Sequence, residues 1–250
     1  MSSVLYEHPL NERIRNYLKL EQLFAQAYNC LNSDSSIVTC NQVFFNALFS
    51  IIDTLERNDV RGDLIKDLEK LEQNLVVWSK APDVDTSALE KNLSQTVKLV
   101  ANLRLTSPRW NQLKEDKLLT SLKQRFAIQG GSSSFDLPQL HFWLHQGENQ
   151  AKYDIKHWLS LLNDISSSLA IILKFIRLRA DFQAIEADSG FYQDNGEGLI
   201  LLRIKLAKDA EYYPTVSGNK FRYSIRFMLP CKHTGRRYAN QATLFELARC

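Results

Sequence analysis

Residues 220–228 alternate between polar and apolar side chains, and the polar positions are mostly cations. Successive side chains of a β-strand point to opposite faces, so Lys220, Arg222 and Arg226 are expected on one face. The other face would carry the apolar members of the segment, which are Phe221, Tyr223, Ile225 and Phe227. This pattern predicts a strand that packs one face into a core and presents a row of cations on the other.

Residues 199–206 show the same alternation, with Arg203 and Lys205 on one face and aliphatic side chains on the other. If the two predicted strands lie side by side, their cations form one basic surface for an anionic partner. A solvated outer face of a sheet produces the same pattern without any binding role. The distribution of charge along the chain is the observation that weighs one interpretation against the other.

The net charge of +3 hides an asymmetry between the two parts of the chain. Residues 199–250 hold ten Lys or Arg against three acids, a net charge of +7. The first 198 residues hold 21 Lys or Arg against 25 acids, a net charge of −4. Basic charge is therefore concentrated in the last fifth of the chain, which favours a binding surface for an anionic partner.

Motifs for catalysis, cofactors and metals are weak. His141 and His145 are four residues apart, but no glutamate follows His141 as the zinc-protease pattern requires. Gly196 and Gly198 lack the third glycine of a dinucleotide-binding loop, and Gly130-Gly131 is not followed by Lys-Ser or Lys-Thr. We therefore predict no enzyme, no cofactor and no metal, and expect the two histidines to be packed and hydrogen-bonded. An enzyme of unknown class, the weaker alternative, would need a deep pocket that gathers both histidines and an acid.

The four cysteines, Cys30, Cys40, Cys231 and Cys250, show no C-x-x-C spacing and are too few for a disulfide framework. We expect reduced thiols. The first residues lack a cationic segment followed by an apolar one, and no apolar run approaches the length of a membrane span. These features predict a soluble cytoplasmic protein that does not insert into a membrane.

Apolar residues recur at steps of three and four through much of the first 180 residues, which predicts amphipathic helices. Pro9 suits the first turn of a helix that runs to about residue 31. Thr39 and Gln42 form a capping-box pattern at the start of a second helix. Asn58-Asp59 opens a third helix and Asp85 caps a fourth.

Two further helices are predicted at residues 114–126 and at about 151–180. The third helix should end at Ala81-Pro82-Asp83. Its leucines have a heptad-like spacing, but over fewer than three heptads. That length indicates packing within a bundle or against a second subunit rather than a coiled coil.

Beyond Asp188 the pattern changes to short alternating runs separated by turn signals at Asp194-Asn195-Gly196 and Ser217-Gly218-Asn219. The predicted strands are residues 191–192, 199–206, 221–228 and 243–247, with a loop around 230–240. Helices first and strands last predict an α+β protein, an N-terminal helical bundle with a small C-terminal antiparallel β-sheet domain. We expect a helical domain at residues 9–186, which provides the core and the dimer contacts. A β-strand domain at 187–250 would carry the basic surface, joined by an extended segment at 3–8.

Two classes of anionic partner fit the cations. Nucleic acid would need exposed aromatic rings beside the cations, whereas the predicted strand places its aromatic residues on the opposite, buried face. An acidic peptide or protein surface is therefore favoured, and a nucleic-acid-binding protein that uses the basic strand face is the alternative. Five exposed contacts of roughly 0.5–1 kcal/mol each give only about 3–5 kcal/mol. Such a weak site is most useful when a dimer grips a polymer that repeats its epitope.

Several stretches, in order from one end of the chain to the other, resemble the ZapD family of bacterial cell-division proteins. The matching stretches are Leu5-Tyr6-Glu7-His8-Pro9-Leu10-Asn11-Glu12, Gly130-Gly131 with Ser134-Phe135-Asp136-Leu137-Pro138, Leu140-His141-Phe142-Trp143-Leu144-His145, Gly190-Phe191-Tyr192-Gln193-Asp194-Asn195-Gly196, Ile225-Arg226-Phe227-Met228 and Phe245-Glu246-Leu247-Ala248. The resemblance therefore covers the whole chain.

The resemblance implies a non-enzymatic homodimer with a helical domain and a β-strand domain. Such a protein binds the C-terminal tail of FtsZ, a tubulin-like GTPase, and cross-links FtsZ filaments in the cytoplasm at the midcell division ring. The family's contacts with the filament are attributed to cationic positions that match Lys19, Lys117 and His141 here. The full set of candidate FtsZ contacts, with the strand cations added, is Lys19, Lys117, His141, Arg203, Lys205, Lys220, Arg222 and Arg226.

Overall fold

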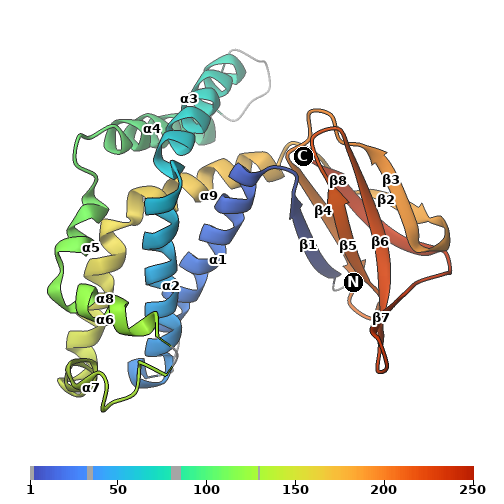
Figure 1. Cartoon of the computed structure of the whole chain (residues 1–250). Coiled ribbons are helices and arrows are strands. Elements are labelled where there is room, and N and C mark those ends of the chain that lie inside the picture. The colour runs from blue at the N-terminus through green and yellow to red at the C-terminus, as the bar shows by residue number, and fades with distance from the viewer. Residues whose placement is uncertain (1–2, 33–35, 80–85, 129) are drawn as a thin grey trace. The chain divides into compact units, whose positions relative to one another are not determined.

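The computed structural model describes residues 3–32, 36–79, 86–128 and 130–250 (Figure 1). The chain divides into two compact units. The helical unit comprises residues 19–172, and the β unit comprises the residues up to Leu18 together with residues 173–250. The boundaries between the units fall inside α1 (Glu12–Asn32) and α9 (Asn163–Arg177).

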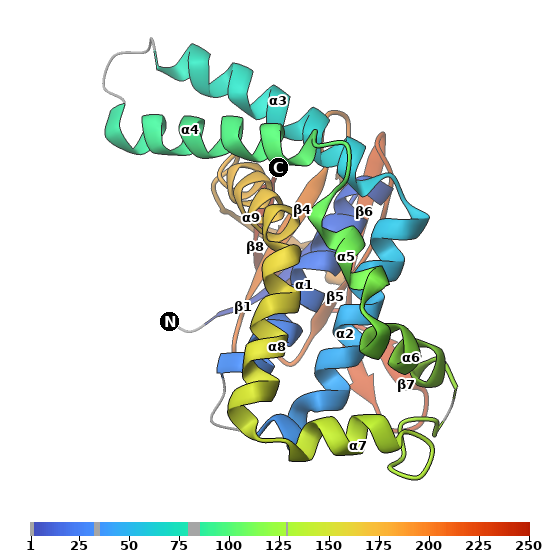
Figure 2. The ribbon, with the colours of Figure 1, turned by 90° about the vertical axis from the view of Figure 1, so that its left-hand side faces the viewer.

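Helices account for most of the described residues up to Arg177, and strands follow, so the predicted α+β class is confirmed. Between α1 and α9 the chain forms α2 (Ile37–Arg57), α3 (Val60–Trp78), α4 (Thr86–Leu103), the 3-10 helix η1 (Arg109–Asn111), α5 (Gln112–Glu115), α6 (Lys117–Phe126), α7 (Pro138–His145) and α8 (Glu148–Leu161). Helices α3 and α4 lie side by side as a hairpin (Figures 1 and 2).

The core of the helical unit is built around aromatic side chains of α2. Phe45 is fully buried, and its ring lies within 6.0 Å of the rings of Phe49, Phe126, Trp143 and Trp158. These rings come from α2, α6, α7 and α8, so one cluster holds four helices together.

By length and hydropathy alone, α2 is apolar enough to cross a membrane, and so is the bent pair formed by α8 and α9. Polar residues such as Asn41, Gln42 and Asp53 interrupt α2, so it contains no continuous apolar run of that length. Core helices of soluble proteins have the same composition, and 56% of the α2 window is buried inside the protein. Burial of Phe44, Phe45, Leu48 and Ile51 accounts for its hydropathy without a bilayer.

The helix starts agree with the prediction at Asp59 and differ from it at Pro9 and Thr39. Pro9 is the last residue of the strand β1 (Ser3–Pro9), and α1 begins only at Glu12, so its predicted place in the first helical turn is wrong. Asp59 caps α3 as predicted, since its carboxylate accepts a hydrogen bond from the N–H of Gly62 at 3.0 Å. The capping box at Thr39 is wrong, because α2 begins at Ile37 and Thr39 lies inside its first turn, with its hydroxyl 3.0 Å from that of Ser36. The predicted end at Ala81-Pro82-Asp83 and the cap at Asp85 lie outside the described residues.

The predicted helix at 114–126 is interrupted at Asp116, whose backbone is extended. The Asp116 carboxylate accepts hydrogen bonds from the N–H of Leu119 and the indole N–H of Trp158, both at 2.9 Å. It therefore caps α6 and ties that helix to α8. Because a capping residue has a non-helical backbone, the chain cannot run through Asp116 as one helix, and the prediction of an uninterrupted helix is wrong.

The long helix predicted at about 151–180 is also wrong. It consists of two helices, α8 and α9, bent by 61° where Leu162 leaves the helical conformation. The apolar stripe runs through the bend because Leu161, Leu162 and Ile165 are all buried, so periodicity gave no sign of the break.

Cys30, at the end of α1, and Cys40, in α2, are joined by a disulfide across a Cα–Cα distance of 5.6 Å. The expectation of four reduced thiols is wrong for this pair, whereas Cys231 and Cys250 are free.

The β unit consists of two antiparallel sheets. Sheet A has the strand order β1 (Ser3–Pro9), β4 (Leu201–Ala207), β8 (Thr243–Arg249) and β2 (Gln183–Ala187). Sheet B has the order β3 (Phe191–Asn195), β6 (Arg222–Cys231) and β5 (Tyr213–Gly218), and β7 (Gly235–Tyr238) pairs with the far end of β6. Strands β2, β5 and β7 were not predicted, and β7 forms a hairpin with β6 in the stretch expected to be a loop.

The two sheets share one core, to which β4 contributes Leu202, Ile204 and Leu206 and β6 contributes Tyr223, Ile225 and Phe227. Strands β4 and β6 therefore belong to opposing sheets and do not pair. The predicted basic surface made of these two strands side by side is wrong, because their cations lie on the outer faces of different sheets. Within each strand, the predicted inward and outward sets are confirmed except for Phe221, which precedes β6 and is 65% exposed.

A polar cluster joins β8 of sheet A to β3 and β6 of sheet B. Arg249 of β8 donates hydrogen bonds to the hydroxyls of Tyr223 at 2.9 Å and Tyr192 at 2.6 Å, and pairs with Asp194 at 3.2 Å. The Tyr192 hydroxyl in turn donates to Asp194 at 2.8 Å. Burial raises the pKa of Tyr223 to about 12, so its phenol stays protonated at neutral pH. The hydrogen bond from Tyr192, supported by the Asn195 N–H and by Arg249, holds the pKa of Asp194 below its usual value.

This cluster should make the β unit lose stability in acid. A carboxyl whose pKa is lowered by folding stabilises the fold above its unfolded pKa, near 3.8, and that contribution is lost as the pH falls through the lower folded value. We therefore expect Asp194→Asn to be less stable than the parent at pH 7, and the difference between them to shrink below about pH 4.

Amide hydrogen exchange of the sheet residues measures the stability of the β unit specifically. All four tryptophans, Trp78, Trp110, Trp143 and Trp158, lie in the helical unit, so tryptophan fluorescence would report the wrong part of the chain. A constant difference between the two proteins from pH 7 to pH 3 would contradict the prediction.

Candidate binding surface on sheet B

The strand register shows which side chains share the outer face of sheet B. Arg226 lies between Phe191 of β3 and Thr215 of β5, and two residues earlier Ser224 lies between Gln193 and Ser217. Arg222 comes next along β6, opposite Asn195. In the other direction Met228 lies between Tyr213 and Tyr238, and Pro230 is opposite Arg236. The face is thus a row of arginines flanked by aromatic and neutral polar side chains.

Arg226 is held between two aromatic rings. Its guanidinium carbon is 4.3 Å from the centroid of Phe191 and 4.9 Å from that of Tyr238. Both rings are partly open to solvent, with Phe191 37% and Tyr238 60% exposed. Stacking covers the faces of a guanidinium but leaves its N–H groups at the edge, so Arg226 is fixed in position and can still bind an anion.

Arg222 borders a small polar cavity of about 230 Å³. The neutral side chains that line it with Arg222 include Gln193, Ser217, Asn219 and Ser224. The Asn219 side chain closes the β5–β6 turn by accepting hydrogen bonds from the N–H groups of Phe221 and Arg222. Lys220 and Phe221 lie within this turn, directly before Arg222, and both are exposed.

The outer face of sheet B carries no acid among its strand residues. Asp194 is the only acid in the four strands, and it lies on the inner side, bonded to Tyr192 and Arg249. In the described part of the chain, Lys220, Arg222 and Arg226 take part in none of the ion pairs. These three cations are therefore available to an external anion.

On sheet A, in contrast, the cations of β4 are paired with acids of the same unit. Arg203 is only 16% exposed and donates to Glu7 at 2.9 Å, and the same carboxylate accepts from Arg177 at 2.6 Å. Lys205 lies 3.6 Å from Glu246 and 3.6 Å above the ring centroid of Phe182. Both predicted cations of β4 are thus neutralised within the fold, and their geometry serves the packing of the β unit.

The chain was compared with known proteins. A family model described as "Cell division protein", ZapD, matches residues 18–226. Proteins named cell division protein ZapD are 42% identical in Yersinia enterocolitica and 40% identical in Yersinia pseudotuberculosis and Yersinia pestis, each over the whole of this chain and 98% of the relative. The chain belongs to the ZapD family. The resemblance found in the sequence is confirmed, and membership supports a role in cell division; ZapD is not a known enzyme family.

The three positions that the ZapD resemblance suggested lie in the helical unit, and all are exposed. Lys19 lies in α1, and Lys117 is the first residue of α6, directly after the Asp116 cap. His141 lies in α7 and its side chain is exposed, so the expectation that it is packed is wrong. A contact role for these three residues stays a prediction.

His141 and His145 do come together, with ring centroids 4.3 Å apart and the Nδ1 atom of His145 2.7 Å from the carbonyl oxygen of His141. Four pockets that are lined by described residues contain neither histidine. Among the residues that the structure describes, no group of three or more His, Cys, Asp or Glu side chains is arranged to hold a metal ion.

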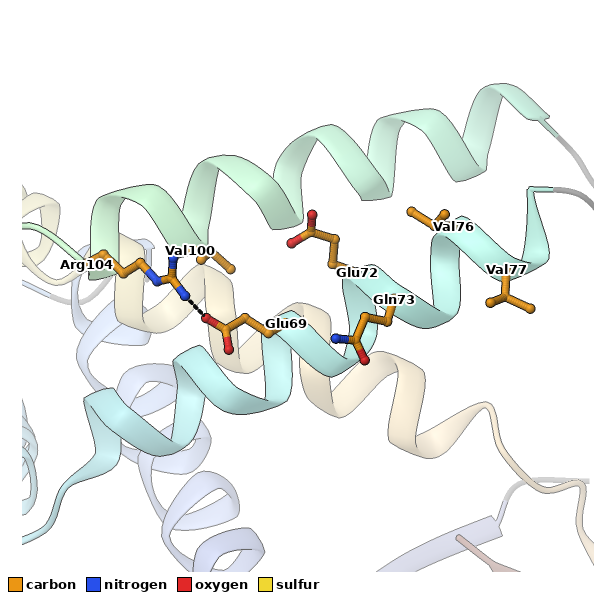
Figure 3. Close-up of a pocket in the computed structure, with 7 residues that line it drawn as sticks. All are labelled: Glu69, Glu72, Gln73, Val76, Val77, Val100 and Arg104. Atoms are coloured by element: carbon orange, nitrogen blue, oxygen red, sulfur yellow. Dashed lines mark hydrogen bonds and ion pairs between the residues drawn. The ribbon is translucent and has the colours of Figure 1, made fainter.

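A second surface feature of this ZapD chain is the groove on the α3–α4 hairpin (Figure 3). Glu69, Glu72 and Gln73 line it with three valines, and an ion pair between Glu69 and Arg104 links the two helices. Val76 and Val77 are 41% and 66% exposed at the end of α3. The hairpin therefore presents apolar side chains to solvent beside a polar rim.

Sequence reasoning missed Phe191, Arg236 and Tyr238 as members of the sheet B face. Residues 230–240 were expected to form a loop, and Pro230 fits that expectation because proline cannot donate to a central ladder. The missed signal is Gly235, which has φ +75° and closes a tight turn between two short runs of strand-forming residues. A hairpin there brings Tyr238 beside Arg226.

The paired cations of sheet A lead to a stability prediction. Glu7→Ala removes the partly buried carboxylate that accepts from Arg203 and Arg177, so the β unit should lose about 3 kcal/mol of unfolding free energy. Glu246→Ala is the matched control: this carboxylate is 52% exposed, and its removal should cost less than about 1 kcal/mol. Exchange of the sheet amides measures both. Equal losses in the two variants would show that the partly buried pair with Glu7 stabilises Arg203 no more than an exposed pair would.

Proposed function

We propose that this ZapD-family protein is a non-enzymatic adaptor that binds the acidic C-terminal tail of FtsZ and bundles FtsZ filaments at the division ring. The observation that carries the proposal is the outer face of sheet B, whose cations have no acid of their own. Family membership supports the division role, and the resemblance supplies FtsZ as the partner.

The cations fall into two groups under this proposal. Lys220, Arg222 and Arg226 bind through the sheet B face, and Lys19, Lys117 and His141 bind through the exposed surface of the helical unit. Arg203 and Lys205 contribute little, because an FtsZ carboxylate would have to displace Glu7 or Glu246. Each exposed contact adds only roughly 0.5–1 kcal/mol, so a single surface holds one tail weakly.

Bundling requires two such surfaces in one particle, and we propose a homodimer. The α3–α4 hairpin supports this step, because Val76 and Val77 are exposed beside a groove of about 500 Å³ whose floor includes the buried Val100. Two surfaces on one dimer raise the apparent affinity for a filament by roughly 10²–10⁴ through avidity.

Charge reversal on sheet B tests the binding step. Arg222→Glu/Arg226→Glu should reduce cosedimentation with FtsZ filaments more than tenfold, because two attractions become repulsions and each 1.4 kcal/mol is a factor of about ten. Lys91→Glu/Lys208→Glu changes the net charge equally at exposed positions on α4 and after β4, and should retain cosedimentation. If both double variants behave alike, net charge alone governs the interaction and the sheet B face is not the site.

A charge in the apolar surface of the hairpin tests the dimer. Val77→Glu should convert a particle of about twice 28.8 kDa into one of 28.8 kDa in light scattering, and should abolish filament bundling. Val43→Glu, at a 52% exposed position of α2, should change neither. A parent protein that is already monomeric would refute the dimer, and a Val77→Glu dimer would place the contact elsewhere.

A further inference from the structure

The outer face of sheet B has exposed aromatic rings beside its cations. Phe191 and Tyr238 flank Arg226 at 37% and 60% exposure, and Phe221, which directly precedes Arg222, is 65% exposed. The objection to nucleic acid raised by the sequence was that the aromatic residues are buried opposite the cations. That objection holds for Tyr223 and Phe227, which are fully buried, and fails for these three rings.

The rings and cations alternate along the face. On β6, Arg222, Arg226 and Pro230 are each four positions apart, which separates them by about 13 Å at the rise of a strand. Pro230 lies opposite Arg236 of β7. Phe191 lies directly beside the second arginine, Tyr238 lies between the second and the third, and the neutral Gln193, Ser217 and Ser224 lie between the first and the second. Sheets that bind unpaired nucleotides stack bases on exposed rings, pair phosphates with cations and bond base edges with neutral polar groups.

We propose that this face binds single-stranded nucleic acid, with bases stacked on Phe191 and Tyr238 and phosphates paired with Arg222, Arg226 and Arg236. This activity goes beyond FtsZ binding and uses two of the same arginines, so the two ligands compete. A carboxylate needs only the N–H groups of an arginine, whereas the exposed parts of the two rings, which each also contact Arg226, add affinity only for a planar partner. The cavity beside Arg222 is lined almost entirely by polar groups, which suits a base edge better than an apolar peptide side chain.

The test is fluorescence anisotropy of a labelled 15-residue oligothymidylate with the full chain, since sites on such sheets span about 4–16 nucleotides. Phe191→Leu and Tyr238→Leu should each weaken binding about tenfold, the loss expected when one base loses its stacking partner. Arg222→Ala should lower the slope of log K against log salt by about 0.7, the value for one phosphate contact on a single strand.

Matched variants separate this site from the rest of the surface. Phe142→Leu removes a ring of 65% exposure from α7, and Lys205→Ala removes a cation from the outer face of sheet A; neither should change binding. Phe191→Leu also withdraws a ring from Arg226, so it is repeated in an Arg226→Ala background. In that background, Phe191→Leu should still weaken oligonucleotide binding if Phe191 stacks a base, and should have no effect if Phe191 only positions Arg226. Circular dichroism of each variant confirms that it is folded.

Three results would overturn the proposal: no binding at about 50 mM salt, binding that depends on the arginines but not on the rings, or equal displacement of the oligonucleotide by poly-glutamate at the same charge. The last two would identify a general site for acidic polymers. All three are independent of FtsZ binding, which is measured by cosedimentation.

Discussion

The arrangement of cations on the outer face of sheet B depends on the burial of one face of every strand in the β unit. Side chains alternate along a strand, and the two sheets bury Leu202, Ile204 and Leu206 of β4 against Tyr223, Ile225 and Phe227 of β6. The polar residues of each strand are thereby forced outwards, and in opposite directions. Two strands with the same alternation thus produce two separate cationic faces instead of one.

The two faces differ because of what lies next to their cations. On sheet A, β1 and β8 place Glu7 and Glu246 in register with Arg203 and Lys205, and the end of α9 adds Arg177. On sheet B, the neighbours of Arg222 and Arg226 are Asn195, Phe191 and Thr215, none of which is charged. A buried pair costs desolvation that only good hydrogen bonding returns, so Arg203 is committed to the fold. Arg226 keeps its charge unneutralised, and ring stacking fixes its position.

Local sequence patterns predicted the elements better than their pairing. Alternation identified β4 and β6 and which of their residues are buried, since that information is contained in consecutive residues. It could not show that β4 pairs with β1, because Arg203 and Glu7 are 196 positions apart and no local pattern links them. The same limit explains the break at Asp116, whose partner Trp158 is 42 positions away. The position of Tyr238 beside Arg226 depends on the β6–β7 hairpin, which was not predicted because residues 230–240 were expected to form a loop.

The separation of the two faces also bears on how a weak surface can be specific. Net charge alone attracts any polyanion, and in the last 52 residues that attraction is largely cancelled on sheet A and concentrated on sheet B. A partner must therefore match a defined row of arginines at intervals of about 13 Å, with rings and hydroxyls between them. The spacing of the arginines and the stacking on the rings discriminate between anions. Each single contact is weak, and a partner that repeats its epitope raises the apparent affinity by occupying several surfaces at once. Affinity and selectivity thus arise from different parts of the structure: selectivity from the register of sheet B, and affinity from the number of surfaces that one particle presents.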